Sequence, residues 1–306
     1  MGLRMDSKGF ETAIAAFPAA IANVLRTNAQ PGSCAVISAA EAASWAEQLG
    51  ITIPQLMLKL APVAATYAIT PISNYHVGAV SQGLSGALYF GANIEFSGEA
   101  LSFCVHAEQA ATTNAWVHGE QGLTSIAISA APCGYCRQFL YELVTAATLE
   151  IYLPDATELL TWFLPDAFGP HDLGVEGGLM EQQNHNLVLP SSAPADAVTN
   201  SALAAANASY APYTFTYSGA AVATSDGSVY NGYYAENAAY NPSMSPLEAA
   251  LVHLNMCGGS FADITAAVLV EVSGPASQLS ATQAVLSSIS TVPLQYYNAT
   301  TGSSSE

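Results

Sequence analysis

The chain has 306 residues, of which 51% are hydrophobic and 9% charged, so it can bury a large core and is long enough for two domains. Its formal net charge is -18, from 5 Lys and Arg against 23 Asp and Glu. Proteins that bind nucleic acid need a basic surface to neutralise phosphates, so this composition argues against a nucleic-acid partner. The most apolar stretch, around residues 60–69, is interrupted by Pro62 and closed by Pro71, which makes it too short to span a bilayer.

The N-terminus carries Arg4 and Lys8 but lacks the long apolar run of a secretory signal. Five cysteines is an odd number and does not form a disulfide framework, so we expect a reducing, cytoplasmic environment. Three cysteines and five histidines do not belong to a recognisable motif. The cysteines are interpreted as small buried hydrophobic residues and the histidines as surface or packed residues: Cys34, Cys104, Cys257, His76, His118, His171, His185 and His253.

Residues 12–60 are alanine-rich, with larger apolar side chains at helical spacing, which predicts helices separated by Pro31-Gly32. Two short β-like runs joined by a Gly- and Ser-rich turn predict a hairpin over residues 75–96. A helix is expected from about Val105 to Val117, then a buried strand, TSIAISA, and another helix opened by Pro132. Strands that alternate with helices predict an α/β sandwich.

The chain also contains a degenerate internal repeat, in which a Gly-Ala-Val-like run and a turn precede Tyr, Gly and Glu at identical offsets. The matching residues are Tyr89, Gly91 and Glu95 in the first half and Tyr230, Gly232 and Glu236 in the second. Because a helical stretch and an apolar strand follow in both halves, the repeat predicts a duplicated domain. The expected layout is a helical segment (1–50), a first domain (51–156), a polar linker region (157–200), a degenerate second domain (201–290) and a tail (291–306), in which the final run NATTGSSSE is expected to be frayed.

Two segments carry the chemistry: Cys-Val-His-Ala-Glu at 104–108 and Pro-Cys-Gly-Tyr-Cys at 132–136. His106, Cys133 and Cys136 offer one imidazole and two thiolates, three good zinc ligands that leave the fourth tetrahedral position for water. The two cysteines would share the first turn of a helix, where unpaired N–H groups favour thiolates.

Glu108 is not required as a ligand. It stands two residues after His106, so both side chains can converge on one metal only close to a helix start. Within reach of a bound water, Glu108 would act as the general acid and base of a hydrolytic reaction.

Each segment alone has another interpretation. C-G-Y-C is equally a thioredoxin-like redox motif, which would make the protein a thiol–disulfide oxidoreductase, and a non-catalytic zinc module is a further alternative. Neither explains a spare glutamate beside an open site. Together and in this order, H-x-E and P-C-x-x-C form the signature of zinc deaminases.

Beyond this signature, the chain resembles the long, two-domain form of cytidine deaminase over roughly residues 50–270. The matching runs are TPIS (70–73), FGANIEF (90–96), VHAEQAA (105–111), PCGYCRQFLYEL (132–143), LPDAFGP (164–170) and YAENAAYNP (234–242). The resemblance implies a three-layer α/β/α sandwich, duplicated as a catalytic and a degenerate domain, in a homodimer. It implies hydrolytic deamination of cytidine and deoxycytidine in pyrimidine salvage, by a zinc-activated water with Glu108 as proton shuttle.

The resemblance also implies roles for substrate-binding residues. Asn93 and Glu95 would hold the ribose 3′-hydroxyl, and the backbone carbonyl of Ala107 would read the base edge with Glu108. Tyr75 stands where the family usually has Phe, against the pyrimidine. Phe168, Ala239 and Tyr240 would line the pocket of the other subunit.

The second half has Pro246-Leu-Glu248 where the first has His106-Ala-Glu108, and no Cys pair follows its apolar strand. We therefore expect one zinc ion per chain. Residues 129–131, Ser-Ala-Ala, lack the polar or aromatic side chains often found there, which leaves the details of base recognition open.

A free base, a nucleotide or a base within nucleic acid is the alternative substrate. A nucleotide would require Lys or Arg near its phosphate, and Arg137 is the one such residue near the motifs. Asn93 and Glu95 favour an unphosphorylated ribose.

Overall fold

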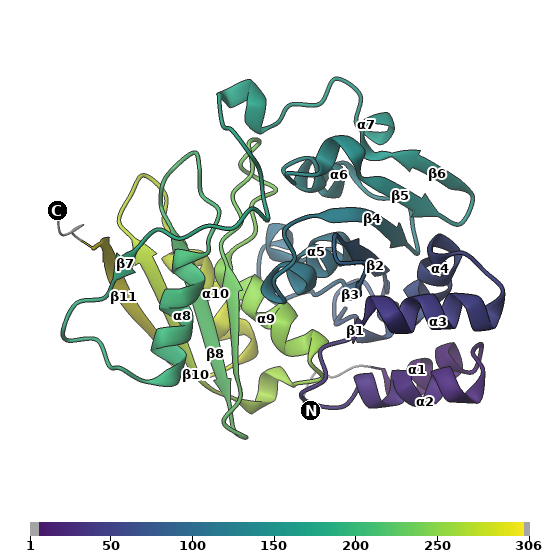
Figure 1. The fold of residues 1–306 in the computed structure, drawn as a ribbon. Coiled ribbons are helices and arrows are strands. Elements are labelled where there is room, and N and C mark those ends of the chain that lie inside the picture. Colours follow the sequence, from purple (N-terminus) through teal and green to yellow (C-terminus); the bar gives the residue numbers. More distant parts are fainter. Residues whose placement is uncertain (1–5, 303–306) are drawn as a thin grey trace.

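The computed structural model describes residues 6–302, which form two α/β domains and an N-terminal group of helices (Figure 1). The strands of the first domain are β1 (Val36–Ile37), β2 (Gly78–Gly83), β3 (Leu88–Ala92), β4 (Leu123–Ile128), β5 (Glu150–Leu153) and β6 (Ala156–Leu159). Those of the second are β7 (Leu187–Val188), β8 (Ser218–Thr224), β9 (Val229–Tyr233), β10 (Ile264–Val272) and β11 (Leu294–Thr301). The sheet orders are β1-β3-β2-β4-β5-β6 and β7-β11-β10-β8-β9.

The helices are α1 (Ser7–Ile14), α2 (Ala19–Asn28), α3 (Ala39–Leu49), α4 (Ile53–Ala64), α5 (Ala107–Val117), α6 (Gly134–Leu140), α7 (Leu160–Phe163), α8 (Ala197–Asn207), α9 (Pro246–Met256) and α10 (Leu279–Ile289). Short 3-10 helices are η1 (Ala65–Tyr67), η2 (Leu101–Phe103), η3 (Ala146–Thr148), η4 (Pro170–Leu173) and η5 (Phe261–Asp263). The predicted hairpin is β2–β3, and the predicted helix from Val105 is α5. The helix after Pro132 begins at Gly134, two residues later than expected, because Cys133 is its N-cap.

The first sheet lies between α4 and α5. A Cβ added at Gly78 would lie 2.1 Å from the carbonyl oxygen of Ala61 in α4, and one added at Gly91 would lie 2.1 Å from the amide nitrogen of Ala111 in α5. Gly78 pairs with Ala92, the neighbour of Gly91, so the two glycines face opposite sides of the sheet. The expected three-layer α/β/α sandwich is therefore confirmed.

The second domain repeats these layers. A Cβ at Gly219 of β8 would lie 2.1 Å from the amide nitrogen of Ala206 in α8, and one at Gly232 of β9 would lie 2.1 Å from that of Ala250 in α9. In both sheets an antiparallel hairpin is followed by one parallel pair, β4 with β5 and β10 with β11. The predicted duplication is confirmed.

The N-terminal helices begin where the sequence provides caps. Ser38 and Thr52 cap α3 and α4, each in a capping box with the residue three positions on, and Gly50 ends α3 in a left-handed conformation. Strand β1, which pairs with β3, was not predicted, because two residues give no periodicity.

No single helix among the described residues is long and apolar enough to cross a membrane, although the pair Ala39–Leu49 and Ile53–Tyr67, bent by 100°, meets those criteria together.

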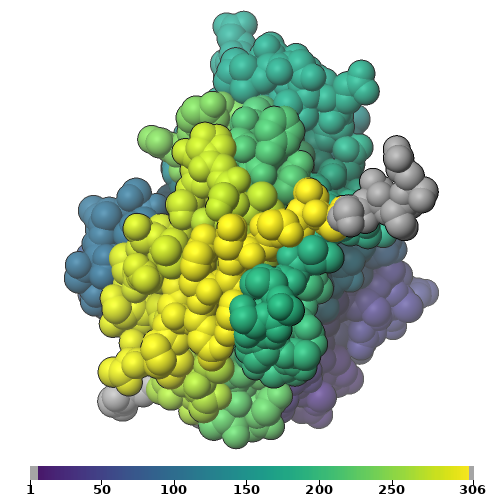
Figure 2. Space-filling model, turned by 90° about the vertical axis from the view of Figure 1, so that its left-hand side faces the viewer, coloured from purple at the N-terminus to yellow at the C-terminus, as the bar shows by residue number. Residues whose placement is uncertain are grey.

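The expected frayed tail is wrong over its described part. Residues Leu294–Thr301 form β11, whose partners in β10 run from Ala267 to Val272, and this C-terminal strand crosses the face seen in Figure 2 (yellow). The polar composition of this segment did not indicate a strand. In the structure β11 is largely exposed and lies between β10 and the short edge strand β7. Residues 303–306 lie outside the described part, and the domain boundaries stay predictions.

The interpretation of Cys34 and Cys257 as isolated buried hydrophobic residues is also wrong. The two residues, separated by 223 positions, are joined as a disulfide, and their sulfur atoms cluster with ring nitrogens of His118 and His253. The four positions are too far apart in sequence to form a recognisable pattern. Cys104 is free and half-buried.

A buried carboxylate joins the two domains. Glu142, just after α6, accepts hydrogen bonds from the hydroxyls of Tyr210 (2.9 Å) and Tyr213 (2.5 Å) and from the N–H of Ala238 (2.8 Å). Burial raises the pKa of Glu142, while these three donors stabilise its charged form. The second domain thus provides every partner that the structure gives this side chain.

We predict that Gly232→Ala lowers the thermal unfolding midpoint by about 5–10 °C, because the new methyl group must displace the backbone of α9. Gly134→Ala is the control, since a Cβ there meets nothing within 4 Å in an α-helix. Calorimetry of the two variants measures the difference. Equal midpoints would show that the helix and strand are not in close contact at Gly232.

Candidate active site

Three predicted metal ligands meet at the starts of two helices. His106 is the N-cap of α5, Cys133 is the N-cap of α6, and Cys136 lies in the first turn of α6. The Nδ1 atom of His106 lies 3.5 Å from Sγ of Cys133 and 3.2 Å from Sγ of Cys136, and the two sulfur atoms are 3.6 Å apart. The expectation that these side chains converge at helix starts is met.

This donor set fits zinc. Zinc binds sulfur at about 2.3 Å and imidazole nitrogen at about 2.0–2.1 Å, so ligands on a tetrahedral ion lie roughly 3.5–3.8 Å from one another. The observed separations need only small shifts to reach these values. Three protein ligands leave one position open, as in a catalytic rather than a structural zinc site.

Glu108 lies beside the ligands without being one of them. It is in the first turn of α5, two residues after His106, and its side chain is buried. Burial raises the pKa of Glu108, although hydrogen bonding to Cys136 and the proximity of His106 oppose the shift. A carboxyl group with a raised pKa beside an open metal site is suited to transfer protons in both directions.

The two cysteines differ in environment. A hydrogen bond from Cys136 lowers the pKa of Cys133 to about 5, and backbone N–H groups of the helix start contribute to this shift. The same hydrogen bond, together with burial, raises the pKa of Cys136. One of the two sulfur atoms is therefore already a thiolate at neutral pH. The unpaired N–H groups at the start of α6 favour this charge.

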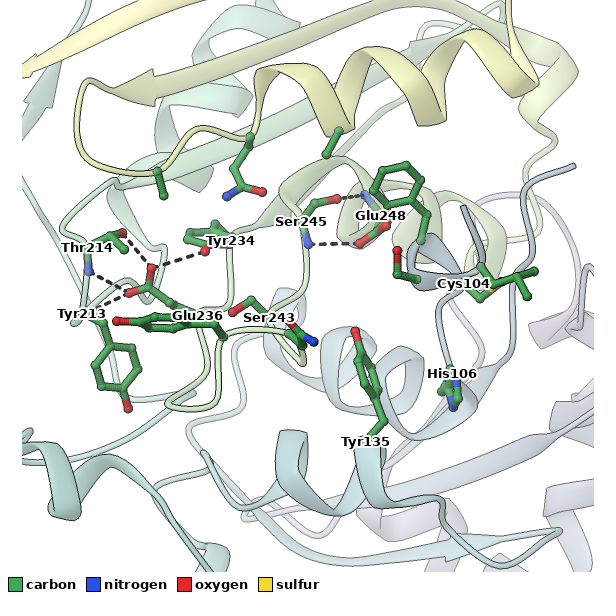
Figure 3. A pocket seen from close by; sticks show the side chains of 18 of the residues that line it. Cys104, His106, Tyr135, Tyr213, Thr214, Tyr234, Glu236, Ser243, Ser245 and Glu248 are labelled. Carbon is green, nitrogen blue, oxygen red and sulfur yellow. Dashed lines mark hydrogen bonds between the residues drawn. The ribbon is translucent and has the colours of Figure 1, made fainter. Parts of the chain in front are cut away.

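A cavity of ≈ 1020 Å³ opens beside His106 (Figure 3). Tyr135 lies on the first-domain side, its ring centroid 5.4 Å from that of His106, and Glu236 and Glu248 lie on the second-domain side. Sequence reasoning missed Tyr135, whose position between the two cysteines was the available signal. Tyr240 is the one predicted substrate residue among those that line this cavity.

Glu95 holds the loop before β2. Its carboxylate accepts hydrogen bonds from the N–H groups of Ile72 (2.8 Å) and Ser73 (3.0 Å) and from the Ser73 hydroxyl (2.5 Å). Although burial opposes it, these donors lower the pKa of Glu95, so the group is ionised at neutral pH. The sequence analysis did not assign a role to Ser73, which donates to Glu95 through both its N–H and its hydroxyl.

Asn93, which directly follows β3, also binds the loop before β2. Its Nδ2 donates to the carbonyl oxygen of Tyr75 (2.9 Å), and its Oδ1 accepts from the N–H of Val77 (2.9 Å). The ring of Tyr75 is 62% exposed. Asn93 and Glu95 thus position the segment that carries Tyr75.

The remaining predicted residues are spread over the surface and the helix start. Phe168 and Tyr240 are 43% and 63% exposed, and Ala239 is bound through its N–H to Asn237. The carbonyl oxygen of Ala107 faces β3, because a Cβ at Gly91 would lie 2.4 Å from it. The group that Ala107 presents at the open start of α5 is its N–H.

The second domain keeps the loop-holding carboxylate. Glu236 accepts hydrogen bonds from the N–H groups of Tyr213 (2.8 Å) and Thr214 (3.1 Å) and from the Thr214 hydroxyl (2.7 Å) (Figure 3). These are the bonds that Glu95 makes in the first domain. The duplicated half has therefore preserved this arrangement without a metal ligand set.

The two helix starts also correspond. The N–H of His106 donates to Oε1 of Gln109 (3.1 Å), and the N–H of Ser245 donates to Oε2 of Glu248 (3.1 Å). Each acceptor is the third residue of its helix, as in a capping box. Burial raises the pKa of Glu248 to about 7.

This correspondence corrects the sequence alignment of the two halves. His106 matches Ser245 rather than Pro246, and Glu108 therefore matches Leu247 rather than Glu248. The sequence alignment matched Glu108 with Glu248 because both are glutamates. This match is one position out, because the connection into α9 is shorter than the one into α5. The second half has lost the proton-transfer residue as well as the ligands.

We predict that Cys133→Ala lowers the zinc content by about one ion per chain, because two ligands cannot hold the metal tightly. Glu108→Gln should leave the zinc content unchanged, since its side chain is not in the ligand cluster. Elemental analysis of purified variants measures both. Loss of zinc from Glu108→Gln would show that this side chain is a ligand.

Comparison with known proteins places these features in one family. Two regions, residues 51–149 and 160–283, match profiles described as "Cytidine and deoxycytidylate deaminase zinc-binding region". A cytidine deaminase of Vibrio vulnificus (strain CMCP6) is 49% identical over 253 residues, which are 82% of this chain and 85% of that protein. One of Aliivibrio fischeri is 43% identical over 289 residues, 94% of this chain and 96% of that protein.

Among solved structures, the cytidine deaminase of Mycobacterium tuberculosis is 30% identical, and the match covers 38% of this chain and 96% of that chain, with a TM-score of 0.35. The second matched region begins at α7, so it includes part of the segment predicted as a linker. The identity with full-length relatives extends over both domains. The chain belongs to the cytidine deaminase family, in its long two-domain form with a zinc-binding site.

Proposed function

We propose that the protein catalyses the hydrolytic deamination of cytidine and deoxycytidine to uridine and deoxyuridine, in pyrimidine salvage. The observation that carries the proposal is the convergence of His106, Cys133 and Cys136 beside the buried Glu108. The relatives named above, described as cytidine deaminases, support the same reaction. A redox role for the cysteine pair would leave Glu108 and His106 without a task.

Zinc at this site supplies a Lewis acid that lowers the pKa of a water molecule. As the oxygen of the attacking water bonds to C4, Glu108 would accept one proton of that water and deliver it to N3 of the pyrimidine. Glu108 would then carry the second proton of the same water to the amine, which leaves C4 as ammonia. Its raised pKa suits both directions of transfer. The N–H of Ala107, rather than its carbonyl, is the backbone group available to the base.

An unphosphorylated nucleoside fits the charges around the site. Arg137, the basic residue near the motifs, donates through Nε to the carbonyl of Pro132 (2.9 Å) and through a terminal nitrogen to that of Phe163 (2.8 Å). It is therefore engaged in holding α6 to α7 and is not free for a phosphate. Glu95 and Asn93 would bind the ribose 3′-hydroxyl as acceptor and donor.

We predict that the purified protein converts cytidine and deoxycytidine at comparable rates and CMP at least about 10²-fold more slowly, because Arg137, the basic residue near the motifs, is already bound to two carbonyl groups. Glu108→Gln should lower kcat by about 10³-fold or more while it retains zinc. Product formation is followed by the absorbance change from cytidine to uridine. Faster turnover of CMP would make a nucleotide the substrate.

Glu95→Gln tests the ribose contact in the same assay. Glu236→Gln is its matched control, because it removes the same loop-holding carboxylate from the half without zinc ligands. Only Glu95→Gln should weaken cytidine more than 3′-deoxycytidine. Equal losses for both nucleosides would assign Glu95 a purely structural role.

We further propose that the protein is a cytoplasmic homodimer with active sites at the subunit interface. Its support is the exposure of Phe168 and Tyr240, large apolar side chains that a partner subunit would cover. Ile72 and Trp162 are also large, apolar and exposed. On this proposal Phe168, Ala239 and Tyr240 of one subunit close the pocket of the other.

Mixed dimers test the shared site. Glu108→Ala and the double variant Phe168→Ala/Tyr240→Ala should each be weakly active alone, whereas co-expression should restore about half of the normal activity per mixed dimer, because one of two symmetry-related pockets is intact. Differently tagged chains isolate the mixed dimers. No recovery in isolated mixed dimers would mean that each pocket is built from one chain.

A further inference from the structure

The ring of His106 is held without the hydrogen bond that usually orients a metal-bound histidine. Its Nδ1 faces Sγ of Cys133 and Cys136, 3.5 and 3.2 Å away, so this nitrogen is the ligand atom. Metal-bound histidines almost always donate their second ring N–H to a carbonyl, a carboxylate or water, which fixes the ring. Over residues 6–302, Nε2 of His106 has no hydrogen-bond partner in the protein. Other contacts must therefore fix the direction of the ring.

Gln109 provides the first of these contacts. Its side chain lies in the first turn of α5 and is 2% exposed. Its Oε1 accepts a hydrogen bond from the backbone N–H of His106 (3.1 Å), and because an N–H can only donate, this bond fixes which end of the amide is oxygen. The imidazole of His106 makes no capping bond to the helix. Gln109 therefore ties the backbone of His106 to α5 and leaves the ring free for the metal.

The amide nitrogen of Gln109 reaches the second domain. Its Nε2 donates to the carbonyl oxygen of Pro242 (3.4 Å), which is buried. Burial raises the pKa of the Tyr135 hydroxyl to about 12, and hydrogen bonding by Gln109 opposes this rise. The ring of Tyr135 packs on that of His106, with centroids 5.4 Å apart and planes at 32° (Figure 3). One amide thus contacts the backbone of the ligand, the residue that packs on its ring, and the second domain.

The segment that carries Pro242 is fixed to both helices of the zinc site. Nδ2 of Asn237 donates to the carbonyl of Gln138 in α6 (3.0 Å). The hydroxyl of Thr113 in α5 donates to Sδ of Met244 (3.2 Å). Both Asn237 and Met244 are buried, so the segment cannot shift without breaking hydrogen bonds inside the protein. The carbonyl of Pro242 is therefore a fixed anchor for α5.

The second half shows why an amide is needed at this position. Glu248 occupies it in α9 and accepts from the N–H of Ser245, as Gln109 accepts from that of His106. A carboxylate has no N–H, so it cannot also donate to a carbonyl. A neutral amide also adds no negative charge beside two thiolates. The half with the metal ligands thus carries the residue that can bond at both ends.

We propose that Gln109 is a positioning residue through which the degenerate domain holds the zinc ligand His106. The carbonyl of Pro242 fixes the amide, and the amide fixes the backbone of His106 and the hydroxyl of Tyr135. These contacts set the direction of Nδ1. The degenerate domain then supports the metal site of its own chain although its residues are absent from the ligand cluster. The kinetic consequence rests on the proposed deamination, whereas the effect on the metal does not.

Zinc affinity tests the proposal directly. Gln109→Met has a similar length and no hydrogen-bonding group, and it should weaken zinc binding by about 10–100-fold in competition with a chromogenic chelator. Thr113→Val is the control, because it lies one turn further along the same face of α5 and loses the bond to Met244 without touching His106. Its zinc affinity should be that of the unmodified protein. Equal affinities in Gln109→Met and Thr113→Val would overturn the proposal.

Gln109→Glu separates the two ends of the amide. It keeps the acceptor for His106 and loses the donor for Pro242. The visible bands of the cobalt-substituted protein, which report ligand geometry, should therefore shift in Gln109→Glu and Gln109→Met and stay in place in Thr113→Val. Unshifted bands in Gln109→Glu would overturn the link to the second domain. If Gln109→Met does not fold, Gln109→Glu decides the question, because Glu248 shows that a glutamate can cap a helix start of this fold.

Steady-state kinetics distinguish this proposal from the proposed function. With saturating zinc, Gln109→Met should lower kcat for cytidine by about 10-fold or more and leave KM nearly unchanged, because the metal centre rather than the nucleoside pocket is altered. A loss confined to KM would overturn the positioning role. A chain that is inactive on cytidine but shows the expected zinc and cobalt results would refute the proposed function and support the role of Gln109.

Discussion

The close approach of α5 to β3 at Gly91 is the constraint on which the catalytic arrangement depends. With no side chain between them, the backbone of the helix rests directly on the strand, and this contact fixes where the helix begins. His106 and Glu108, two residues apart at the helix start, can then reach one point, which they could not do in the middle of a helix. The start of α6 brings Cys133 and Cys136 to the same point, so the chemistry follows from the placement of two helix ends.

The second domain keeps that scaffold and has lost the chemistry. Gly232 holds α9 as Gly91 holds α5, and Glu236 binds its loop as Glu95 does, which shows that these contacts are needed for the fold. Ser245 now occupies the place of His106. The Ser245 hydroxyl caps its helix by accepting from the N–H of Glu248 (3.3 Å), whereas the imidazole of His106 makes no such bond, so the fold tolerates the change that abolishes metal binding.

Local patterns predicted much of this from the sequence. The hairpin, α5, the zinc ligands and the duplication were visible because short spacings and residue type determine them. Features that depend on distant contacts were not: β11 pairs along a polar sequence, and Cys34 meets His118 and Cys257 only after both domains have formed. The correspondence of Ser245 with His106 required the structure because it depends on the length of a connection, which identical letters do not reveal.

The buried bond network of Glu142 has a consequence for motion. Separating the domains at this contact would strip a carboxylate of three donors inside the protein, and stripping even part of such a network costs several kcal/mol. The two halves therefore cannot open and close as hinged lobes during each turnover. Substrate must therefore reach the metal ligands, and product must leave them, through the cavity that opens beside His106 while the two domains stay together.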